Sequence, residues 1–306
     1  MKPRFVAILQ ALFVVFLWAT SWVLIKIGLK DIPPLVFAGL RYFLAFIGLL
    51  VALGFSEAKK ELKTIQHPEW SRLVLLGLLF YAGTQGASFL ALFYLPAVTV
   101  NLLWSFSSVI IALLGILWLS ETPTWLQWGG IGLAMAGAII YFYPASIQHG
   151  QLVGILVAVV GILANSASAI LGRSINRAQK YHPLVVTVVS MGVGSVVLLV
   201  SGVLLEGFPS ISPTGWVIIA WLAFINTAFA FTLWNLTLRT LSAIESSIIN
   251  STMMIWIPVF AVLFLGESIS VKQVIGLLAA GLGTLVVQLR RLPLASRTGW
   301  RTRVPR

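Results

Sequence analysis

Two sets of polar side chains within otherwise apolar stretches are the residues of this sequence best suited to binding a ligand. Each set is spaced i, i+3, i+4, i+7, which places its members on one face of a helix. The two sets are Tyr81, Thr84, Gln85 and Ser88, and Asn101, Trp104, Ser105 and Ser108. Amide, hydroxyl and indole groups exchange hydrogen bonds with a polar solute, but these stripes hold no acid pair or metal-ligand cluster, so they indicate binding and not catalysis.

Residues that could carry metal, covalent or nucleotide chemistry are scarce in the sequence. There is no cysteine, and His67, His149 and His182 lie in polar breaks without ligand-like spacing. No aspartate or glutamate falls in the middle of an apolar stretch, and no phosphate-binding glycine pattern occurs. The sequence therefore predicts no metal, no cofactor, no enzymatic activity and no ATP-driven pump. A buried carboxylate for proton relay and a channel filter are also not visible.

The composition indicates an integral membrane protein. Of 306 residues, 59% are hydrophobic and 9% are charged, and the mean hydropathy is +1.01, whereas a soluble domain carries roughly a quarter charged residues. The formal net charge of +12 falls in polar breaks and in the tail, and not on the basic face that a nucleic-acid-binding domain needs. The expected partners are a lipid bilayer and a small organic solute, with no nucleic acid.

Apolar runs of about twenty residues, the length that crosses a hydrocarbon core of roughly 30 Å, recur along the chain. They predict ten transmembrane helices at residues 5–26, 34–55, 72–94, 97–119, 125–143, 152–173, 183–205, 216–237, 243–265 and 271–289. The first run is too long for a cleavable signal peptide, and no small-residue cleavage site follows it. It is therefore expected to remain in the mature protein.

Lysine and arginine are distributed unevenly between the two sides that ten spans define. With the N-terminus inside, sixteen lie in cytoplasmic segments, and the outside segments hold only Lys26, Lys30 and Lys272. Because short basic loops stay cytoplasmic, both termini are predicted to face the cytoplasm. Residues 290–306 are then a basic cytoplasmic tail, which acts as a topology anchor or touches anionic lipid headgroups.

The two halves of the chain repeat at an offset of 146 residues. The pairs that match without a gap include Ser105 with Ser251, Glu121 with Glu267, Gln127 with Gln273, Gly130 with Gly276, and Gly137 with Gly283. The first five-helix repeat covers residues 1–146 and the second covers 147–289. Because five is odd, the second repeat enters the membrane upside down. The predicted fold is all-α, with ten helices in two inverted repeats, the architecture of secondary transporters whose solute site lies near midplane.

The sequence resembles the EamA-type transporters of the drug/metabolite transporter superfamily. The resemblance rests on Phe16-Leu17-Trp18-Ala19-Thr20-Ser21, on Leu40-Arg41-Tyr42-Phe43-Leu44-Ala45, on Ser120-Glu121-Thr122 and on Gly266-Glu267-Ser268. It covers essentially the whole chain and implies a multi-pass protein of a bacterial inner membrane, similar to exporters of amino acids and other metabolites. One departure is Ala112, which stands where the family often has a proline that the second half keeps as Pro258.

Helix faces and the repeat offset together define a candidate substrate-binding set. Its members are Trp18, Ser21, Tyr81, Gln85, Asn101, Trp104, Ser105, Asn165, Thr227, Trp234, Asn250 and Ser251. Polar side chains that face lipid are costly, so these residues must face other helices or a wet cavity. Ordinary hydrogen bonding between helices is the alternative for each residue taken singly. Spans 125–143 and 271–289 lack such a face and are expected to be peripheral.

A few charged or helix-breaking residues suggest further roles. Arg41, the one charge inside a span away from its ends, could bind a solute carboxylate, pair with helix-end carbonyls or extend to the headgroups. Glu121 and Glu267 close helices on opposite faces and could latch two states, or could make only helix-end contacts. Pro258 removes one backbone hydrogen bond and could kink its helix as a hinge or as a static feature.

Taken together, these features predict a secondary transporter that exports amino acids or similar small metabolites by alternating access without ATP. Two alternatives remain open: a non-transporting membrane sensor or scaffold, and a transporter of cationic drugs or sugar phosphates. The sequence leaves open the solute, the direction of transport, the coupling ion and the oligomeric state.

Overall fold

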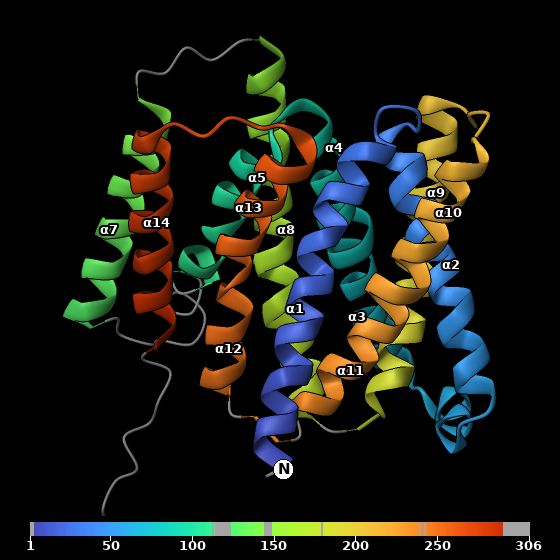
Figure 1. The fold of residues 1–306 in the computed structure, drawn as a ribbon. Helices are drawn as coiled ribbons and strands as arrows, with labels where there is room; N and C mark the ends of the chain where they lie inside the picture. Colours follow the sequence, from blue (N-terminus) through green and yellow to red (C-terminus); the bar gives the residue numbers. More distant parts are fainter. Residues whose placement is uncertain are drawn as a thin grey trace, which may run out of the picture.

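The protein is a bundle of helices whose long axes run in roughly the same direction (Figure 1). The computed structural model describes residues 3–111, 113, 124–143, 149–178, 180–238, 240–241 and 243–289. Within these ranges all regular structure is helical, as the sequence predicts. Ala112, Glu121 and the tail 290–306 lie outside the described residues.

The helices follow the predicted spans closely. The first half holds α1 (Pro3–Gly28), α2 (Pro34–Gly54), the 3₁₀ helix η1 (Glu57–Thr64), α3 (His67–Gly77), the π-helical η2 (Leu78–Gln85), α4 (Gly86–Tyr94), α5 (Ala97–Ser105) and α7 (Trp125–Phe142). The second half holds α8 (His149–Arg177), α9 (Pro183–Glu206), α10 (Pro213–Ala223), the π-helical η3 (Phe224–Phe229), α11 (Ala230–Thr237), α12 (Ala243–Ser251), α13 (Met253–Leu265) and α14 (Val271–Leu289). α2, α9 and α10 each begin at a proline, whose missing N–H costs nothing in a first turn.

Eight helical segments in the described part of the chain are long and apolar enough to cross a membrane. They are Arg4–Gly28, Pro34–Gly54, His67–Tyr94, Trp125–Phe142, Gly150–Asn176, Pro183–Glu206, Pro213–Trp234 and Ile248–Leu265. Two shorter apolar helices, Ala97–Ile111 and Val271–Val287, lie in the predicted fourth and tenth spans. The all-helical membrane class is therefore confirmed, and the count of ten spans stays a prediction.

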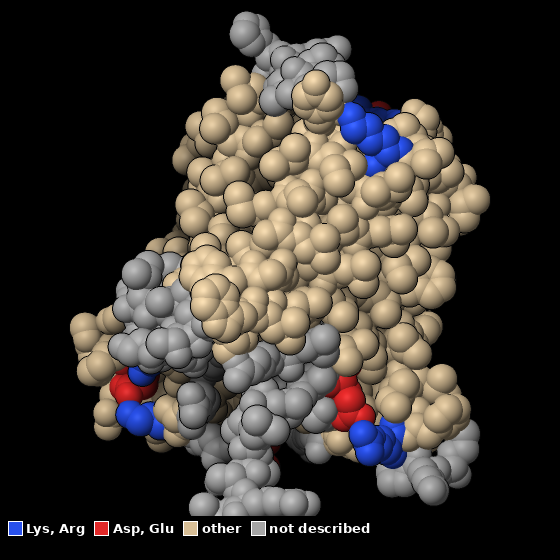
Figure 2. All heavy atoms as spheres, turned by 90° about the vertical axis from the view of Figure 1, so that its left-hand side faces the viewer, with Lys and Arg blue, Asp and Glu red and all other residues tan. Residues whose placement is uncertain are grey.

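Polar contacts between helix ends and the turns beside them fall into two groups, one at each end of the bundle. One end carries the pairs Arg4–Glu245, Lys180–Glu69 and Arg72–Ser174, and the other carries Lys26 with the Leu95 carbonyl and Lys272 with the Tyr143 carbonyl. The first group comes from segments predicted to be cytoplasmic, and the second comes from segments predicted to be outside. On the face that Figure 2 shows, charged side chains lie near the two ends, with a broad uncharged band between them.

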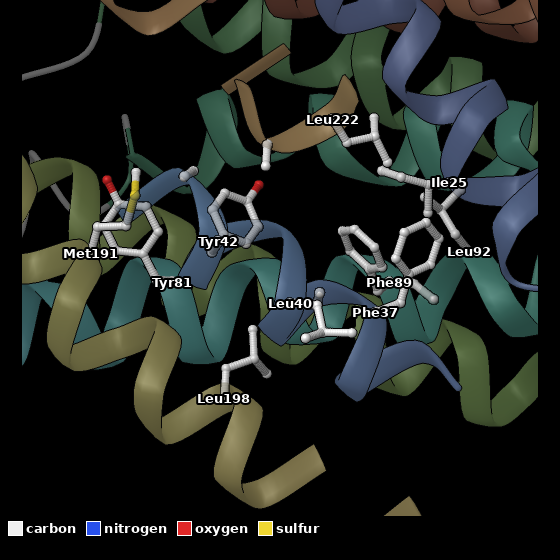
Figure 3. Close-up of a cluster of buried hydrophobic side chains, with 14 of the residues drawn as sticks. Ile25, Phe37, Leu40, Tyr42, Tyr81, Phe89, Leu92, Met191, Leu198 and Leu222 are labelled. Atoms are coloured by element: carbon white, nitrogen blue, oxygen red, sulfur yellow. The ribbon is translucent and has the colours of Figure 1, made fainter. Parts of the chain in front are cut away.

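The largest apolar core forms where α2 packs against α9, α4 and α10 (Figure 3). Phe37 and Phe89 meet edge to face in this core, with ring centroids 5.2 Å apart. α2 approaches α9 closely because Gly39 lacks a side chain; a Cβ there would lie 2.5 Å from the Leu199 Cα atom. This close packing buries the middle of α2, including Arg41.

The helices α7 and α14 pack against each other through glycines (Figure 1). A Cβ on Gly130 would lie 2.8 Å from the Gly283 carbonyl oxygen, and a Cβ on Gly137 would lie 2.6 Å from the Gly276 carbonyl oxygen. Small residues of this kind let membrane helices approach until their backbones touch. The earlier glycine of α7, Gly130, thus meets the later glycine of α14, and Gly137 meets the earlier one, so the two helices run antiparallel. At the 146-residue offset, Gly130 matches Gly276 and Gly137 matches Gly283.

Two π-helical segments begin at matching positions of the two halves. η2 starts at Leu78 and η3 starts at Phe224, 146 residues later. In each, a threonine hydroxyl donates to the carbonyl five residues back: Thr84 to Leu79 at 2.9 Å, and Thr227 to Leu222 at 2.8 Å. π-Helical turns are rare and occur frequently at functional sites.

Two helices are also interrupted at matching positions. α5 gives way to a turn at Phe106, and α12 and α13 are separated by a turn at Thr252, 146 residues later. α13 remains helical through Pro258, and the turn at Thr252 lies six residues before it, so a role of Pro258 as a hinge or a static kink stays a prediction. The matching break in the first half occurs although the sequence there has Ala112 in place of a proline. The breaks therefore do not need a proline.

Candidate functional site: an uncharged polar cavity

A cavity of about 230 Å³ lies among α1, α5, α8, α12, α13 and α14. Its lining consists of Trp22, Asn101, Trp104, Ser105, Ser107, Ser108, Asn165, Asn250, Ser251, Met253, Met254, Gly281 and Thr284. None of these residues is charged. The cavity therefore offers amides, hydroxyls and indole rings at the level where two of its wall helices are interrupted.

The two halves contribute matching positions to the cavity wall. At the 146-residue offset, Trp104 corresponds to Asn250 and Ser105 to Ser251, and all four line the cavity. Each serine directly precedes the turn that ends its helix. The cavity is thus built around the meeting point of the two repeats.

Hydrogen bonds within the wall decide which groups remain available to a solute. The Asn101 side-chain nitrogen is buried and has no partner among the described residues. The Ser105 hydroxyl donates to the Leu102 carbonyl at 2.7 Å, which leaves its oxygen as an acceptor. The ring of Trp104 lies against α8, because Gly161 has no side chain; a Cβ there would be 2.9 Å from the ring.

Half of the predicted substrate-binding set lies in the cavity. These residues are Asn101, Trp104, Ser105, Asn165, Asn250 and Ser251. The other six are outside its lining. Trp18 and Trp234 pack against each other with ring centroids 5.2 Å apart, and Tyr81 packs against Tyr42 at 5.6 Å in the core. Gln85 is half-buried on η2 and does not line the cavity.

The structure also adds lining residues that the helix-face argument did not select. Ser107 and Met253 directly follow the two turns, and the i, i+3, i+4, i+7 pattern selects their neighbours Ser108 and Met254 instead. Gly281 and Thr284 come from α14. Span 271–289, expected to be peripheral, therefore also contributes to the cavity wall, and the polar Thr284 was the available signal.

Ser21 and Thr227 belong to a second polar cluster, between α1, α2 and η3. Asn226 donates from Nδ2 to the Ser21 hydroxyl at 2.8 Å and to the Leu17 carbonyl of α1. The next residue, Thr227, accepts a hydrogen bond from the Nε group of Arg41 at 3.1 Å. Arg41 is 5% exposed, so it does not extend to the headgroups, and that alternative is wrong.

Glu267 makes a helix-end contact across the two halves of the chain. Its carboxylate accepts from the backbone N–H groups of Ala97 at 2.6 Å and Val98 at 3.1 Å, in the first turn of α5. Glu206 does the same for α2, accepting from the N–H groups of Leu35 and Val36. A carboxylate at a helix N-terminus satisfies backbone donors and complements the helix dipole.

The apolar helices around this cavity define a multi-pass membrane protein with an internal site of solute size. The chain belongs to the EamA-like transporter family, which matches it twice, over residues 5–143 and 152–289. The resemblance seen in the sequence is thereby confirmed, and the protein is a membrane transporter and not an enzyme. Its partners are accordingly a small solute and the bilayer.

Several relatives are similar to almost the whole chain. The uncharacterized transporter YvbV of Bacillus subtilis is 27% identical, and the match covers 90% of this chain and 89% of YvbV. A probable amino-acid metabolite efflux pump of Salmonella typhimurium is 28% identical over 89% of this chain and 92% of its own length. An S-adenosylmethionine/S-adenosylhomocysteine transporter of Chlamydia trachomatis is 23% identical over 85% and 83%.

One solved structure shares the fold. This crystal structure superposes with a TM-score of 0.64 at 19% identity, and the match covers 95% of this chain and all of that one. At this identity the likeness concerns the fold alone.

Proposed function

We propose that the protein is a secondary transporter, which carries a small organic solute across a bacterial inner membrane by alternating access and without ATP. The observation that carries this proposal is the uncharged polar cavity, whose wall includes the repeat-matched pairs Trp104/Asn250 and Ser105/Ser251 beside two interrupted helices. Broken helices at the interface of two repeats are the usual setting of a transporter's solute site.

The proposed architecture is ten spans in two inverted five-helix repeats. The contact between α7 and α14 supports it. These helices are the fifth of each repeat, and they run antiparallel, as inverted repeats require. In the proposed orientation both termini, and the basic tail 290–306, face the cytoplasm. The segregation of loops into two ends, one of which holds the N-terminal Arg4, supports this assignment.

The size and polarity of the cavity favour an amino acid or a metabolite of similar size. At about 230 Å³ the cavity is smaller than the roughly 300–1,000 Å³ of pockets for drug-sized ligands. Its described lining residues include no carboxylate to balance a cationic drug, and no lysine or arginine to balance the two negative charges of a sugar phosphate. The Salmonella relative, a probable amino-acid metabolite efflux pump, supports export as the direction.

Alternating access requires that the two ends of the cavity open in turn. The turns at Phe106 and Thr252 are the proposed hinges, since each interrupts a wall helix next to a lining serine. Glu267 and its repeat counterpart Glu121 are proposed to close opposite ends, with Glu267 holding the start of α5 in this structure. Pro258 lies in the helix that follows the second turn and keeps a supporting role at most.

Counterflow in proteoliposomes tests this function. Vesicles preloaded with each of the twenty L-amino acids are exposed to the labelled compound, and we expect at least one to accumulate transiently. Trp104→Ala and Asn250→Ala should lower that counterflow by about tenfold, which corresponds to about 1.4 kcal/mol. Trp221→Ala is the matched control, because Trp221 is 48% exposed on α10 and does not line the cavity. Counterflow of none of the twenty by well-folded protein would favour a sensor or scaffold.

A further inference from the structure

Arg41 is the only charged residue among the buried side chains of the described chain. It lies in the first half of α2, seven residues after Pro34, with its guanidinium carbon 5.1 Å from the centre of the Tyr42 ring. A guanidinium group stays protonated in proteins, so burial cannot neutralise it. A charge held in such a place needs a partner of opposite sign.

The carboxylates that the structure describes do not supply that partner. Six of the seven bind elsewhere: Glu57 to Lys60, Glu61 to the His182 N–H, Glu69 to Lys180, Glu206 to the α2 N-terminus, Glu245 to Arg4, and Glu267 to the α5 N-terminus. The seventh, Asp31, is exposed in the turn after α1. Within the described residues, Arg41 therefore has no counter-ion.

The hydrogen bonds of Arg41 leave one edge of its guanidinium unused. The Nε group donates to the Thr227 hydroxyl oxygen, and Thr227 in turn donates to the Leu222 carbonyl, so the π-helical turn fixes the hydroxyl as an acceptor. The N–H groups on the two Nη atoms have no partner among the described residues. A planar pair of parallel donors matches the two oxygens of a carboxylate.

We propose that Arg41 binds the carboxylate group of the transported solute, with Thr227 as the residue that positions the guanidinium. This inference rests on the proposed transport function and narrows the substrate class to carboxylates, including zwitterionic amino acids. One guanidinium balances one negative charge, so a singly charged carboxylate fits better than a phosphate dianion. Two other cations, Lys26 and Lys272, lie near span ends and donate to backbone carbonyls at one end of the bundle.

The cluster and the cavity share α1. Asn226, adjacent to Thr227, donates to Ser21 of α1, and Trp22 of the same helix lines the cavity. The Asn226 side-chain oxygen is buried and has no partner among the described residues. It is an acceptor suited to an N–H donor, such as the ammonium group of an amino acid. Arg41 on α2 thus offers hydrogen-bond donors, and Asn226 on the neighbouring η3 offers a hydrogen-bond acceptor.

The test measures binding to purified protein by thermal stability, with each of the twenty L-amino acids and the carboxamide of any that binds. We expect at least one amino acid to stabilise the wild-type protein and its carboxamide to fail. Arg41→Lys keeps the charge but loses the planar pair of parallel N–H donors, and it should weaken the apparent affinity for the amino acid by about tenfold or more. Thr227→Val should weaken it several-fold with the charge unchanged. Arg72→Lys, in a surface hydrogen bond to Ser174, is the matched control and should bind as the wild type does.

The outcomes separate this inference from the proposed function. It is overturned if the carboxamide binds as well as the acid, if no amino acid binds, or if Arg41→Lys and Thr227→Val, both folded, bind normally. Counterflow that depends on Trp104 and not on Arg41 would support the transport function and reject Arg41 as the carboxylate site. Amino-acid binding that depends on Arg41, without counterflow in vesicles, would support the carboxylate site and reject the transport function.

Discussion

Lys26 and Glu267 hold opposite ends of the same turn. The turn joins α4 to α5; Lys26 donates to the Leu95 carbonyl at its start, at 2.7 Å, and Glu267 accepts from the Ala97 N–H group at its end, at 2.6 Å. Lys26 comes from the end of α1, and Glu267 comes from the segment between α13 and α14. Two charged side chains therefore fasten three separate parts of the chain at one end of the bundle.

Loosening that turn should open this end of the cavity. In Glu267→Gln one amide oxygen replaces two carboxylate oxygens, which removes about 1–1.5 kcal/mol of charge-assisted hydrogen bonding and should raise the open fraction roughly five- to tenfold. The measurement is the rate at which an impermeant thiol reagent, added outside intact cells, modifies a cysteine placed at Ser105. The sequence has no cysteine to interfere.

Glu206→Gln provides the control for this prediction. Glu206 caps the first N–H groups of α2 with the same geometry, but it is not part of the turn between α4 and α5. It should leave the labelling rate at position 105 unchanged. Equal acceleration by the two substitutions would mean that Glu267 stabilises the fold without gating it.

The orientation can be measured with a single cysteine in the loop before α3. Lys60→Cys places a thiol on η1, where Lys60 is exposed and pairs only with Glu57. Because basic loops stay inside, an impermeant reagent should modify this thiol in inverted vesicles and not in intact cells. Labelling in intact cells would reverse the proposed topology, together with the assignment of the Lys26 end to the outside.

Gly161 sets the position of the Trp104 ring, so adding one methyl group should change the cavity. In Gly161→Ala the new Cβ would lie 2.7 Å from the Ala87 Cβ and 2.9 Å from that ring, so α8 and the ring must move apart and the ring is displaced in the cavity wall. We expect counterflow of a transported amino acid to show a KM raised about three- to tenfold, for a loss of about 0.7–1.4 kcal/mol. Gly129→Ala, where nothing lies within 4 Å, is the control and should keep the wild-type KM.

The glycines between α7 and α14 should be among the least replaceable. In Gly137→Ala the Cβ would lie 2.4 Å from the Ala280 nitrogen, and backbone cannot move aside as a flexible side chain can. Overpacking of this kind costs about 1–3 kcal/mol, so the melting temperature should fall. Gly132→Ala, also on α7 but facing open space, should not lower it. Similar melting temperatures for the two variants would contradict the close packing.

The sequence predicts the helices well because a membrane span is a local property. Length and apolarity decide whether a stretch such as 183–205 can cross a bilayer, and α9 covers it. The polar face of the fourth span is local too, and its residues Asn101, Trp104 and Ser105 lie in the cavity wall; their role in binding stays a prediction. The same spacing continues across the turn at Phe106 to Ser108, which also lines the cavity, but it does not select the neighbouring Ser107.

Residues whose role depends on a neighbouring helix could not be assigned from the sequence. Whether Arg41 extends to the headgroups or inward depends on what stands beside α2, and the neighbour is Thr227, 186 residues away. Trp18 belongs to the candidate substrate-binding set, but its ring packs against that of Trp234, with centroids 5.2 Å apart. A tryptophan on an inward face satisfies the same pattern whether a solute or another ring covers it.

The direct backbone contact between α7 and α14 has a mechanical consequence. Where two helices touch through glycines, no flexible side chains lie between them that could adjust when the helices shift, so we expect the two helices to move as one rigid unit. Gly281 and Thr284 of this α7–α14 pair form one wall of the cavity. During the proposed transport cycle we expect the α7–α14 pair to stay fixed while the α4–α5 turn moves, so spin labels on α7 and α14 should keep one separation while labels at Ala97 and Glu267 change theirs.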